Sequence, residues 1–298
     1  MNPSTDWEFT DDRGHLTTAG HHPIRVVAYI QAGATLWDHG LRPMGVFGSH
    51  HDGDTPDPAK GGDLPLADLR SFGAGSALDL DALFAAEPDL VVAVSYGGGQ
   101  MYGIDPGAAA YLEERVPVVV LDVGKDRPLD VIRDRFTALA RSLRTPFEPA
   151  MADLARAEAR LRALTAPPGG PRVLALSAAG AETAYLARPL TWPDLKVLAG
   201  LGVELIDPDE GSGGNWRTVG WAEAAALEPD IVLADVRANA ATPEELRDSE
   251  PWRAIEARAR LVPWNPEAPS SHRAHAAFLH TVADAVENTA ENTVADAG

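Results

Sequence analysis

The chain has 298 residues, of which 45% are hydrophobic and 23% charged, and this is enough apolar sequence for two domains of ordinary size. Its formal net charge of −19 at pH 7 argues against nucleic-acid binding, which needs a basic surface. The absence of Cys excludes disulfides, thiolate metal sites and a cysteine nucleophile, and no run approaches the ~18 apolar residues that span a bilayer.

The first half of the chain alternates strand and helix patterns. Apolar residues at 24–29 predict a strand, residues 34–38 a helix, and residues 44–47 a second strand. The next segment, 48–70, is rich in Asp, Pro, Gly and His, and a loop of this length is unusual unless it carries function or mobility. Further elements expected in this half are a Gly-rich loop at 97–99, a helix at 107–114 and a strand at 116–121.

One sequence unit occurs twice, at 80–92 and at 221–233. Each copy reads as an amphipathic helix, a Glu-Pro-Asp turn and a buried strand. The prolines of the two turns, Pro88 and Pro229, are 141 residues apart, which is nearly half the chain. This period is too long for a solenoid and instead predicts two similar α/β lobes.

The longest helical pattern covers 129–164, where Pro146 and Pro149 are expected to kink or interrupt it. A helix of roughly 35 residues would be ~50 Å long and could run from one lobe to the other. The second half then predicts strands at 172–176, 203–206 and 261–264 and a closing helix at 272–287. The domain prediction is an N-terminal α/β lobe at 1–126, a connecting helix at 127–168 and a C-terminal α/β lobe at 169–298.

The order of these elements resembles the class III periplasmic substrate-binding proteins of iron-siderophore, haem and cobalamin importers. The resemblance rests on the strand that opens with Arg25, the Leu-Asp-x-Leu-x-x-x-x-Pro-Asp-Leu-Val unit from Leu80, its copy from Trp221 and the helix between them, and it extends from Trp7 to the final helix. It implies two Rossmann-like α/β lobes joined by one long interdomain helix, with the ligand cleft between the lobes.

The function implied by the resemblance is capture, without chemistry, of a ferric siderophore or similar metal chelate for an ABC importer. The protein would act as a monomer and hold no cofactor of its own. A small-molecule chelate and an ABC permease are then the expected partners.

Ligand-binding residues are expected where strands end, because ligands of α/β sheets bind outside the carboxyl ends of the strands. A bulky and often anionic chelate suits Arg donors and the faces of Tyr and Trp rings. The leading polar candidates are Arg217, which follows the Gly-rich loop 211–214, and Arg237. The full predicted set is Tyr29, Gln31, Ser49, His50 and Tyr96 in the first lobe, with Tyr185, Trp192, Trp216, Arg217, Arg237 and Trp264 in the second.

Docking to a permease is implied by the resemblance and concerns one acidic residue on each lobe, seven residues before the proline of the repeat. Asp81 stands at this position in the first lobe. In the second lobe Ala222 replaces the expected acid and Glu223 follows it. Asp81 and Glu223 are therefore the docking candidates, and the substitution at Ala222 leaves docking open.

Enzyme function is not expected, because the chain lacks the Gly-x-Ser-x-Gly elbow, the phosphate-binding loop and the His-Glu-x-x-His helix. We predict no metal ligands, although direct binding of a metal ion stays an alternative. Its only starting point is the group His50, Asp52 and Asp54 in the long loop.

The second alternative is a cytosolic carrier or sequestering protein for a chelate or natural product on the same fold. The sequence from Met1 shows neither a signal peptide nor a lipid-anchor Cys. We expect an extracytoplasmic, envelope-associated protein if an export signal precedes Met1, and a cytoplasmic one if Met1 is the true start.

Overall fold

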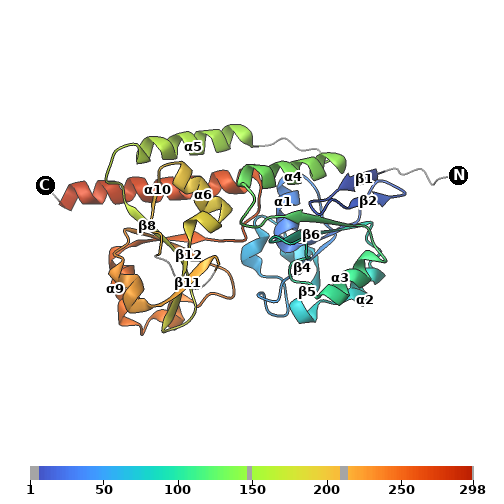
Figure 1. The fold of residues 1–298 in the computed structure, drawn as a ribbon, viewed down its shortest axis with the longest axis horizontal. Helices are drawn as coiled ribbons and strands as arrows, with labels where there is room; N and C mark the ends of the chain where they lie inside the picture. The colour runs from blue at the N-terminus through green and yellow to red at the C-terminus, as the bar shows by residue number, and fades with distance from the viewer. Residues whose placement is uncertain (1–6, 146–149, 209–213, 297–298) are drawn as a thin grey trace. The chain divides into compact units, whose positions relative to one another are not determined.

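The computed structural model describes the backbone of residues 7–145, 150–208 and 214–296, which form two compact units (Figure 1). Unit 1 comprises Met1–Pro149 and Glu267–Ala274, and unit 2 comprises Ala150–Pro266 and His275–Gly298. Within the described residues, every helix is too short or too polar to cross a membrane.

Unit 1 is built on a five-stranded parallel sheet with the order β5-β4-β3-β6-β7. Every residue of β3, β4 and β6 is buried, as expected for parallel strands with both faces covered. The strands are β3 (Val26–Tyr29), β4 (Gly45–Gly48), β5 (Arg70–Ala74), β6 (Leu90–Ser95) and β7 (Val118–Asp122).

Helices and an antiparallel hairpin complete the described part of unit 1. Two of the helices begin at an Asp N-cap, since Asp79 accepts a hydrogen bond from the Ala82 N–H and Asp105 accepts one from the Gly107 N–H, both at 2.8 Å. The hairpin strands are β1 (Trp7–Thr10) and β2 (Leu16–Ala19), and the helices are α1 (Ile30–Asp38), α2 (Leu80–Ala85), α3 (Pro106–Glu113) and α4 (Leu129–Ser142). Three short 3-10 turns, η1 (Pro58–Gly61), η2 (Leu66–Asp68) and η3 (Gly75–Ala77), fall between β4 and α2.

The strand order of unit 1 contains a topological switch point. From β3 the chain proceeds outward to β4 and β5, then returns to place β6 on the other side of β3. Connections that leave neighbouring strands in opposite directions open a crevice at their carboxyl ends, where α/β proteins bind ligands. A ligand site is therefore expected at the loops that follow β3, β4, β5 and β6.

Unit 2 contains a mixed sheet with the order β11-β9-β8-β12-β13, and a short β10 also pairs with β8. Strands β8, β12, β13 and β10 run parallel, while β9 is antiparallel to both β8 and β11. The strands are β8 (Arg172–Ala178), β9 (Thr183–Ala187), β10 (Glu204–Leu205), β11 (Trp216–Gly220), β12 (Ile231–Asp235) and β13 (Arg260–Trp264).

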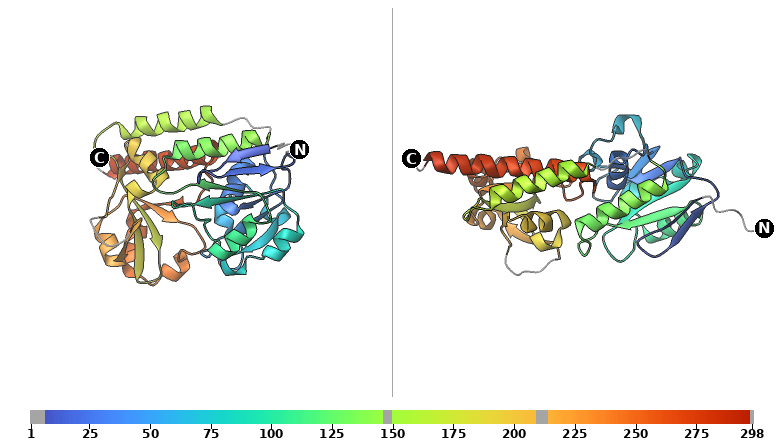
Figure 2. Two further views of the ribbon diagram at one scale, coloured as in Figure 1. Left: turned by 45° about the vertical axis from the view of Figure 1, so that its right-hand side comes forward. Right: turned by 90° about the horizontal axis from the view of Figure 1, so that it is seen from above.

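The sheet of unit 2 separates two apolar cores. Along β8, Val173 and Ala175 belong to one core and Leu174 and Leu176 to the other, because successive side chains of a strand point to opposite faces. Figures 1 and 2 show α5 and α10 side by side over this unit, where Arg160 pairs with Asp284 at 2.6 Å. The helices are α5 (Met151–Thr165), α6 (Pro193–Gly200), α7 (Trp221–Ala226), α8 (Pro243–Leu246), α9 (Glu250–Arg258) and α10 (His272–Asp296), with the turn η4 (Pro189–Thr191) before α6.

The sequence repeat forms the same local structure in both units. The first copy is α2 followed by β6, and the second is α7 followed by β12, as predicted. In each turn the Glu before Pro has a positive φ, 47° at Glu87 and 50° at Glu228. A left-handed residue ends each helix, and the Pro that follows prevents its continuation.

The Asp of each turn fixes the start of another strand. Asp89 accepts hydrogen bonds from the backbone N–H groups of Ile24 (2.9 Å) and Arg25 (2.8 Å), just before β3. In unit 2 the carboxylate of Asp230 accepts one from the N–H of Arg172 at 2.8 Å, at the start of β8. The Pro-Asp pair therefore both ends a helix and aligns the central strand of its sheet.

The single helix predicted over 129–164 is wrong, because this stretch forms two helices. Helix α4 ends at Ser142, and Arg144 has a left-handed φ of 52°; α5 begins at Met151 in the other unit. Pro146 and Pro149 lie outside the described residues. Proline removes a backbone donor and disfavours helical conformation in the preceding residue, which explains why the apolar period continues although the helix does not.

We predict that replacing Asp230 with Ala lowers the free energy of unfolding by about 1–3 kcal/mol, because the Arg172 N–H loses a charged acceptor. Urea unfolding followed by circular dichroism measures the change. The exposed Glu182 provides a control, and Glu182→Ala should change stability by less than about 0.5 kcal/mol. Equal effects of the two substitutions would contradict the role given to Asp230.

Candidate functional site

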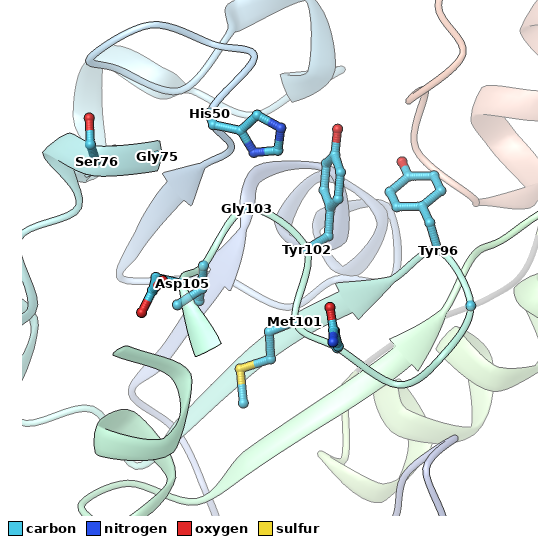
Figure 3. A pocket seen from close by; sticks show the side chains of 11 residues that line it. His50, Gly75, Ser76, Tyr96, Met101, Tyr102, Gly103 and Asp105 are labelled. Atoms are coloured by element: carbon cyan, nitrogen blue, oxygen red, sulfur yellow. The ribbon is translucent and has the colours of Figure 1, made fainter. Parts of the chain in front are cut away.

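A pocket of about 480 Å³ lies in unit 1 at the carboxyl ends of β4, β5 and β6. Its volume falls within the range of small-molecule sites, and it lies beside the switch point of the sheet. Figure 3 shows the side chains that converge on it from the three loops. Its lining includes the side chains of His50, Ser76, Tyr96, Met101, Tyr102 and Asp105.

Two glycines allow the three loops to approach closely. A Cβ on Gly103 would lie 2.7 Å from the Cα of Ser49, and a Cβ on Gly75 would lie 2.6 Å from the Cα of His50. Both glycines also have positive φ, 78° and 53°, a conformation that other residues rarely adopt. The loops after β5 and β6 thus press against the backbone that follows β4 and define the pocket wall.

Aromatic rings form one wall of the pocket, with Tyr102 at the centre. Its ring centroid lies 4.6 Å from that of Tyr96 and 5.9 Å from that of His50. In Figure 3 these three rings stand side by side, and the hydroxyls of Tyr96 and Tyr102 point the same way. His51 stacks on Tyr102 at 6.2 Å, while Tyr29 contacts the Tyr102 ring edge at 5.7 Å from inside the unit.

Behind this wall lies a buried ion network centred on Lys60, whose side chain is 1% exposed. The Lys60 Nζ lies 2.6 Å from Oδ1 of Asp52 and 2.9 Å from Oε1 of Glu267. The Tyr29 hydroxyl donates to Oε2 of Glu267 at 2.6 Å, and the Ser49 hydroxyl donates to Asp52 at 2.9 Å. We call these five residues the Lys60 network.

The network sets the protonation of two of its members. Burial raises the pKa of Tyr29 well above its ordinary value of 10, and the charge of Glu267 raises it further, so Tyr29 remains a hydrogen-bond donor. Burial alone would raise the pKa of Asp52, but the hydrogen bond and charge of Lys60 outweigh it and lower the pKa. Asp52 is therefore held as a carboxylate.

Three predicted ligand residues are inside unit 1 rather than on the pocket lining. Tyr29 and Ser49 belong to the Lys60 network and are 0% exposed. Gln31, which is 3% exposed, donates from Nε2 to the carbonyl of Ala268 at 3.0 Å. Of the five residues predicted in this lobe, the pocket brings together only His50 and Tyr96.

The predicted aromatic residues of unit 2 form a cluster. The Trp216 ring centroid lies 4.9 Å from that of Trp192, 5.9 Å from that of Trp264 and 6.4 Å from that of Tyr185. Trp264 is buried at 1% exposure and Trp192 at 7%, while Trp216 is partly exposed and Tyr185 is 40% exposed. Trp192 and Trp264 therefore belong to the core, and Trp216 and Tyr185 present the accessible faces.

The carboxylate of Asp194 forms a hydrogen bond with one ring of this cluster. Trp264 Nε1 donates to Asp194 Oδ2 at 2.6 Å, in the first turn of α6. Burial raises the pKa of Asp194 to about 6, although the hydrogen bond from Trp264 acts in the opposite direction. The charge of Asp194 therefore changes between pH 5 and 7.

Each predicted arginine pairs with a carboxylate of unit 2. Arg217, on β11, forms an ion pair with Glu223 on α7. Arg237 is 9% exposed and contacts both oxygens of Asp235, with Nη2 at 2.7 Å from Oδ2. Both remain predictions for ligand contact, and their charge is already balanced; residues 211–213 of the Gly-rich loop lie outside the described residues.

The predicted docking acids lie on the equivalent helices of the two units, with Glu223 one residue beyond the position that corresponds to Asp81. Asp81 is exposed in the first turn of α2, and Glu223 is exposed in the first turn of α7. In the part of the chain described by the structure, no three His, Asp or Glu side chains come together in a geometry that could hold a metal ion.

Sequence reasoning missed Tyr102, Asp105, Lys60 and Glu267. Tyr102 and Asp105 follow the Gly-rich loop after β6, so the position of the loop was the available signal. Lys60 is an isolated Lys in a segment rich in Asp and Pro, which was a weaker signal. Nothing in the local sequence connects Glu267 to a loop more than 200 residues earlier.

In each of the two units, helices pack on a mainly parallel sheet. This architecture is that of a solute-binding protein of the periplasmic type. Residues 49–260 match the model of the periplasmic binding protein family. The chain belongs to the periplasmic binding protein family.

Solved structures of binding proteins have the same fold as this chain. The ferric-siderophore receptor DesE from Streptomyces coelicolor has a TM-score of 0.83 and 27% sequence identity, over 95% of this chain and 98% of that chain. The siderophore-binding protein FhuD from Vibrio cholerae, bound to Fe³⁺-Desferal, has a TM-score of 0.63 and 16% identity over 90% and 98%. The catecholate-siderophore binding protein VctP from Vibrio cholerae has a TM-score of 0.60 and 14% identity over 94% and 99%; these last two similarities show the fold alone. No curated protein sequence matches the chain.

We predict that Asp194 makes stability depend on pH. Its pKa is about 6 in the folded protein against an ordinary value of 3.8, so the folded state binds this proton more tightly. The contribution of Asp194 to the free energy of unfolding should therefore fall by about 2–3 kcal/mol as pH rises from about 4 to 7. Urea unfolding at pH 4.5 and pH 7 measures it through tryptophan fluorescence.

Asp194→Asn supplies the control, because Asn keeps an acceptor for Trp264 and does not titrate. The difference in stability between the variant and the parent should be larger at pH 7 than at pH 4.5, in favour of the variant. A difference that is the same at both pH values would contradict the raised pKa.

Proposed function

We propose that this protein captures a ferric siderophore, or a similar metal chelate, as the binding component of an ABC importer, working as a monomer outside the cytoplasmic membrane. The observation that carries the proposal is the pocket of unit 1, with Tyr102, Tyr96 and His50 as one wall at the carboxyl ends of parallel strands. Aromatic faces suit a bulky, partly unsaturated chelate. The similarity to a ferric-siderophore receptor over nearly the full length of both chains supports this ligand class.

The proposed role is binding without conversion. A volume of about 480 Å³ accommodates a large part of a chelate of drug-like size. Its aromatic and polar side chains can hold the ligand by stacking and hydrogen bonds, neither of which breaks a covalent bond.

Native mass spectrometry and isothermal titration calorimetry test the proposal directly. The ligand panel consists of a ferric trihydroxamate, a ferric tricatecholate, haem and cobalamin, with the iron-free chelators as controls. We expect one ferric chelate to bind one protein monomer with micromolar or tighter affinity and to be recovered unchanged. Failure of every ligand to bind, or chemical alteration of the bound one, would overturn the proposal.

We predict that Tyr102→Ala weakens binding of the chelate identified in that panel. Loss of the central ring removes about 1–2 kcal/mol of stacking and burial, which corresponds to roughly 5- to 30-fold in affinity. Tyr111→Ala is the matched control, since Tyr111 is 40% exposed on α3 and does not line the pocket. Titration calorimetry of both variants should separate them, and equal affinities would place the ligand elsewhere.

Permease docking is part of the proposal and rests on Asp81 and Glu223, which are exposed in the first turns of the two repeat helices. Charge reversal at both positions, Asp81→Lys with Glu223→Lys, should abolish uptake of the radiolabelled chelate by cells. The affinity of the purified Asp81→Lys single variant should stay within about twofold of the parent, because Asp81 does not line the pocket. Normal uptake by the double variant would show that docking uses other residues.

A further inference from the structure

The side chains that line the pocket of unit 1 include a negatively charged group and no positively charged one among the described residues. No Lys or Arg lines the pocket in the described part of the chain, whereas Asp105 does. Asp105 is exposed and its carboxylate accepts the Gly107 N–H at 2.8 Å as the N-cap of α3. The carboxylate is therefore held at the pocket by the helix that it caps.

Behind the wall, the Lys60 network has a net charge of −1. Both Lys60 and the Tyr29 hydroxyl donate to Glu267, one to each carboxylate oxygen, so both oxygens act as acceptors. Lys60 also pairs with Asp52, which leaves one ammonium to balance two carboxylates. Asp57, buried at 3% exposure, adds a further carboxylate to this loop and accepts the Ala59 N–H at 2.9 Å.

These charges lie close behind the surface that a ligand would touch. The Ser49 hydroxyl is 3.4 Å from the Lys60 Nζ, and the next residue, His50, lines the pocket. The Tyr29 ring, whose hydroxyl contacts Glu267, lies against the Tyr102 ring of the wall at 5.7 Å. A buried charge is screened by salt much less than a surface charge, so its field reaches the pocket.

The arginines predicted to hold an anionic chelate lie in unit 2, each beside a carboxylate. Arg217 pairs with Glu223, and Arg237 pairs with Asp235. Each guanidinium is thus balanced by a carboxylate of its own unit.

We propose that the pocket of unit 1 selects neutral and cationic ferric chelates against anionic ones, through Asp105 and the net charge of the Lys60 network. The inference rests on the proposed function, because it names the charge class of the ligand for the same pocket. A ferric trihydroxamate core is neutral, since three hydroxamates balance Fe³⁺, whereas a ferric tricatecholate carries three negative charges. One unit charge at about 10 Å and an effective dielectric constant near 20 changes affinity by roughly tenfold.

The test uses one linear ferric trihydroxamate in three forms: with a terminal amine (+1), with that amine acetylated (0) and with it succinylated (−1). Titration calorimetry at pH 8, above the ordinary titration range of imidazole, compares the three forms. The parent protein should bind the amine form about 10-fold or more tightly than the succinylated form. Equal affinities for the three forms, or tightest binding of the succinylated form, would overturn the charge selection while leaving the proposed function in place.

Two variants identify the selecting charges. Asp105→Asn removes a charge and keeps a good N-cap, and Glu267→Gln removes a charge and keeps an acceptor for the Tyr29 hydroxyl. Each should reduce the ratio of amine-form to succinyl-form affinity by about tenfold or more, because the two forms differ by two unit charges. Glu8→Gln, on the exposed face of β1, is the control and should leave the ratio unchanged.

The ratio separates electrostatic selection from a structural role, because a merely structural defect weakens all three forms alike. An unchanged ratio in both variants overturns the assignment, and if Glu267→Gln fails to fold, Asp105→Asn decides alone. Binding of a ferric tricatecholate but of none of the three forms would also overturn the charge selection and keep the proposed function. Failure of every ferric chelate would overturn both.

Discussion

The buried ammonium of Lys60 is the interaction on which unit 1 depends. Taking an ammonium out of water is unfavourable unless carboxylates and hydroxyls surround it, and here Asp52, Glu267, Tyr29 and Ser49 do so. These residues come from η1, the loop after β4, the end of β3 and the segment after β13. Removing one partner of such a pair typically costs about 3–5 kcal/mol. The segment 49–60, which the sequence marks as long and polar, is therefore fixed where it borders the pocket.

The fold could be predicted to a large extent because its signals are local. Buried apolar runs identify the parallel strands, and the repeated Glu-Pro-Asp turn identifies the two units. The turn is informative because it has a mechanical role: Asp89 and Asp230 align the first strand of each sheet. Over 129–164 apolar periodicity identifies the buried face but does not show where a helix ends; the chain forms α4 and α5 rather than one connecting helix, on either side of the prolines expected to kink or interrupt it.

The candidate site could be predicted only as a set of loops. Sheet topology indicates which loops meet, and His50 and Tyr96 followed from it. The direction of each side chain could not be predicted from the topology. Tyr29 and Ser49 point into the unit, where their hydroxyls contact Lys60. Tyr102, from a Gly-rich loop, instead forms part of the pocket wall. The direction of these side chains depends on the buried charge of Lys60, which is balanced in part by Glu267, a residue far away in the sequence.

The contact between Tyr29 and Glu267 joins residues 238 positions apart in the chain. A ribosome delivers the chain from its N-terminus at about 5–20 residues per second, so Tyr29 and Lys60 emerge long before Glu267 is made. Until then the ammonium of Lys60 lacks one of its two counterions, and its burial is correspondingly unfavourable. Of the two units, the one that is synthesised first thus has its core completed by a segment made after most of the other, which ties its maturation to synthesis of unit 2.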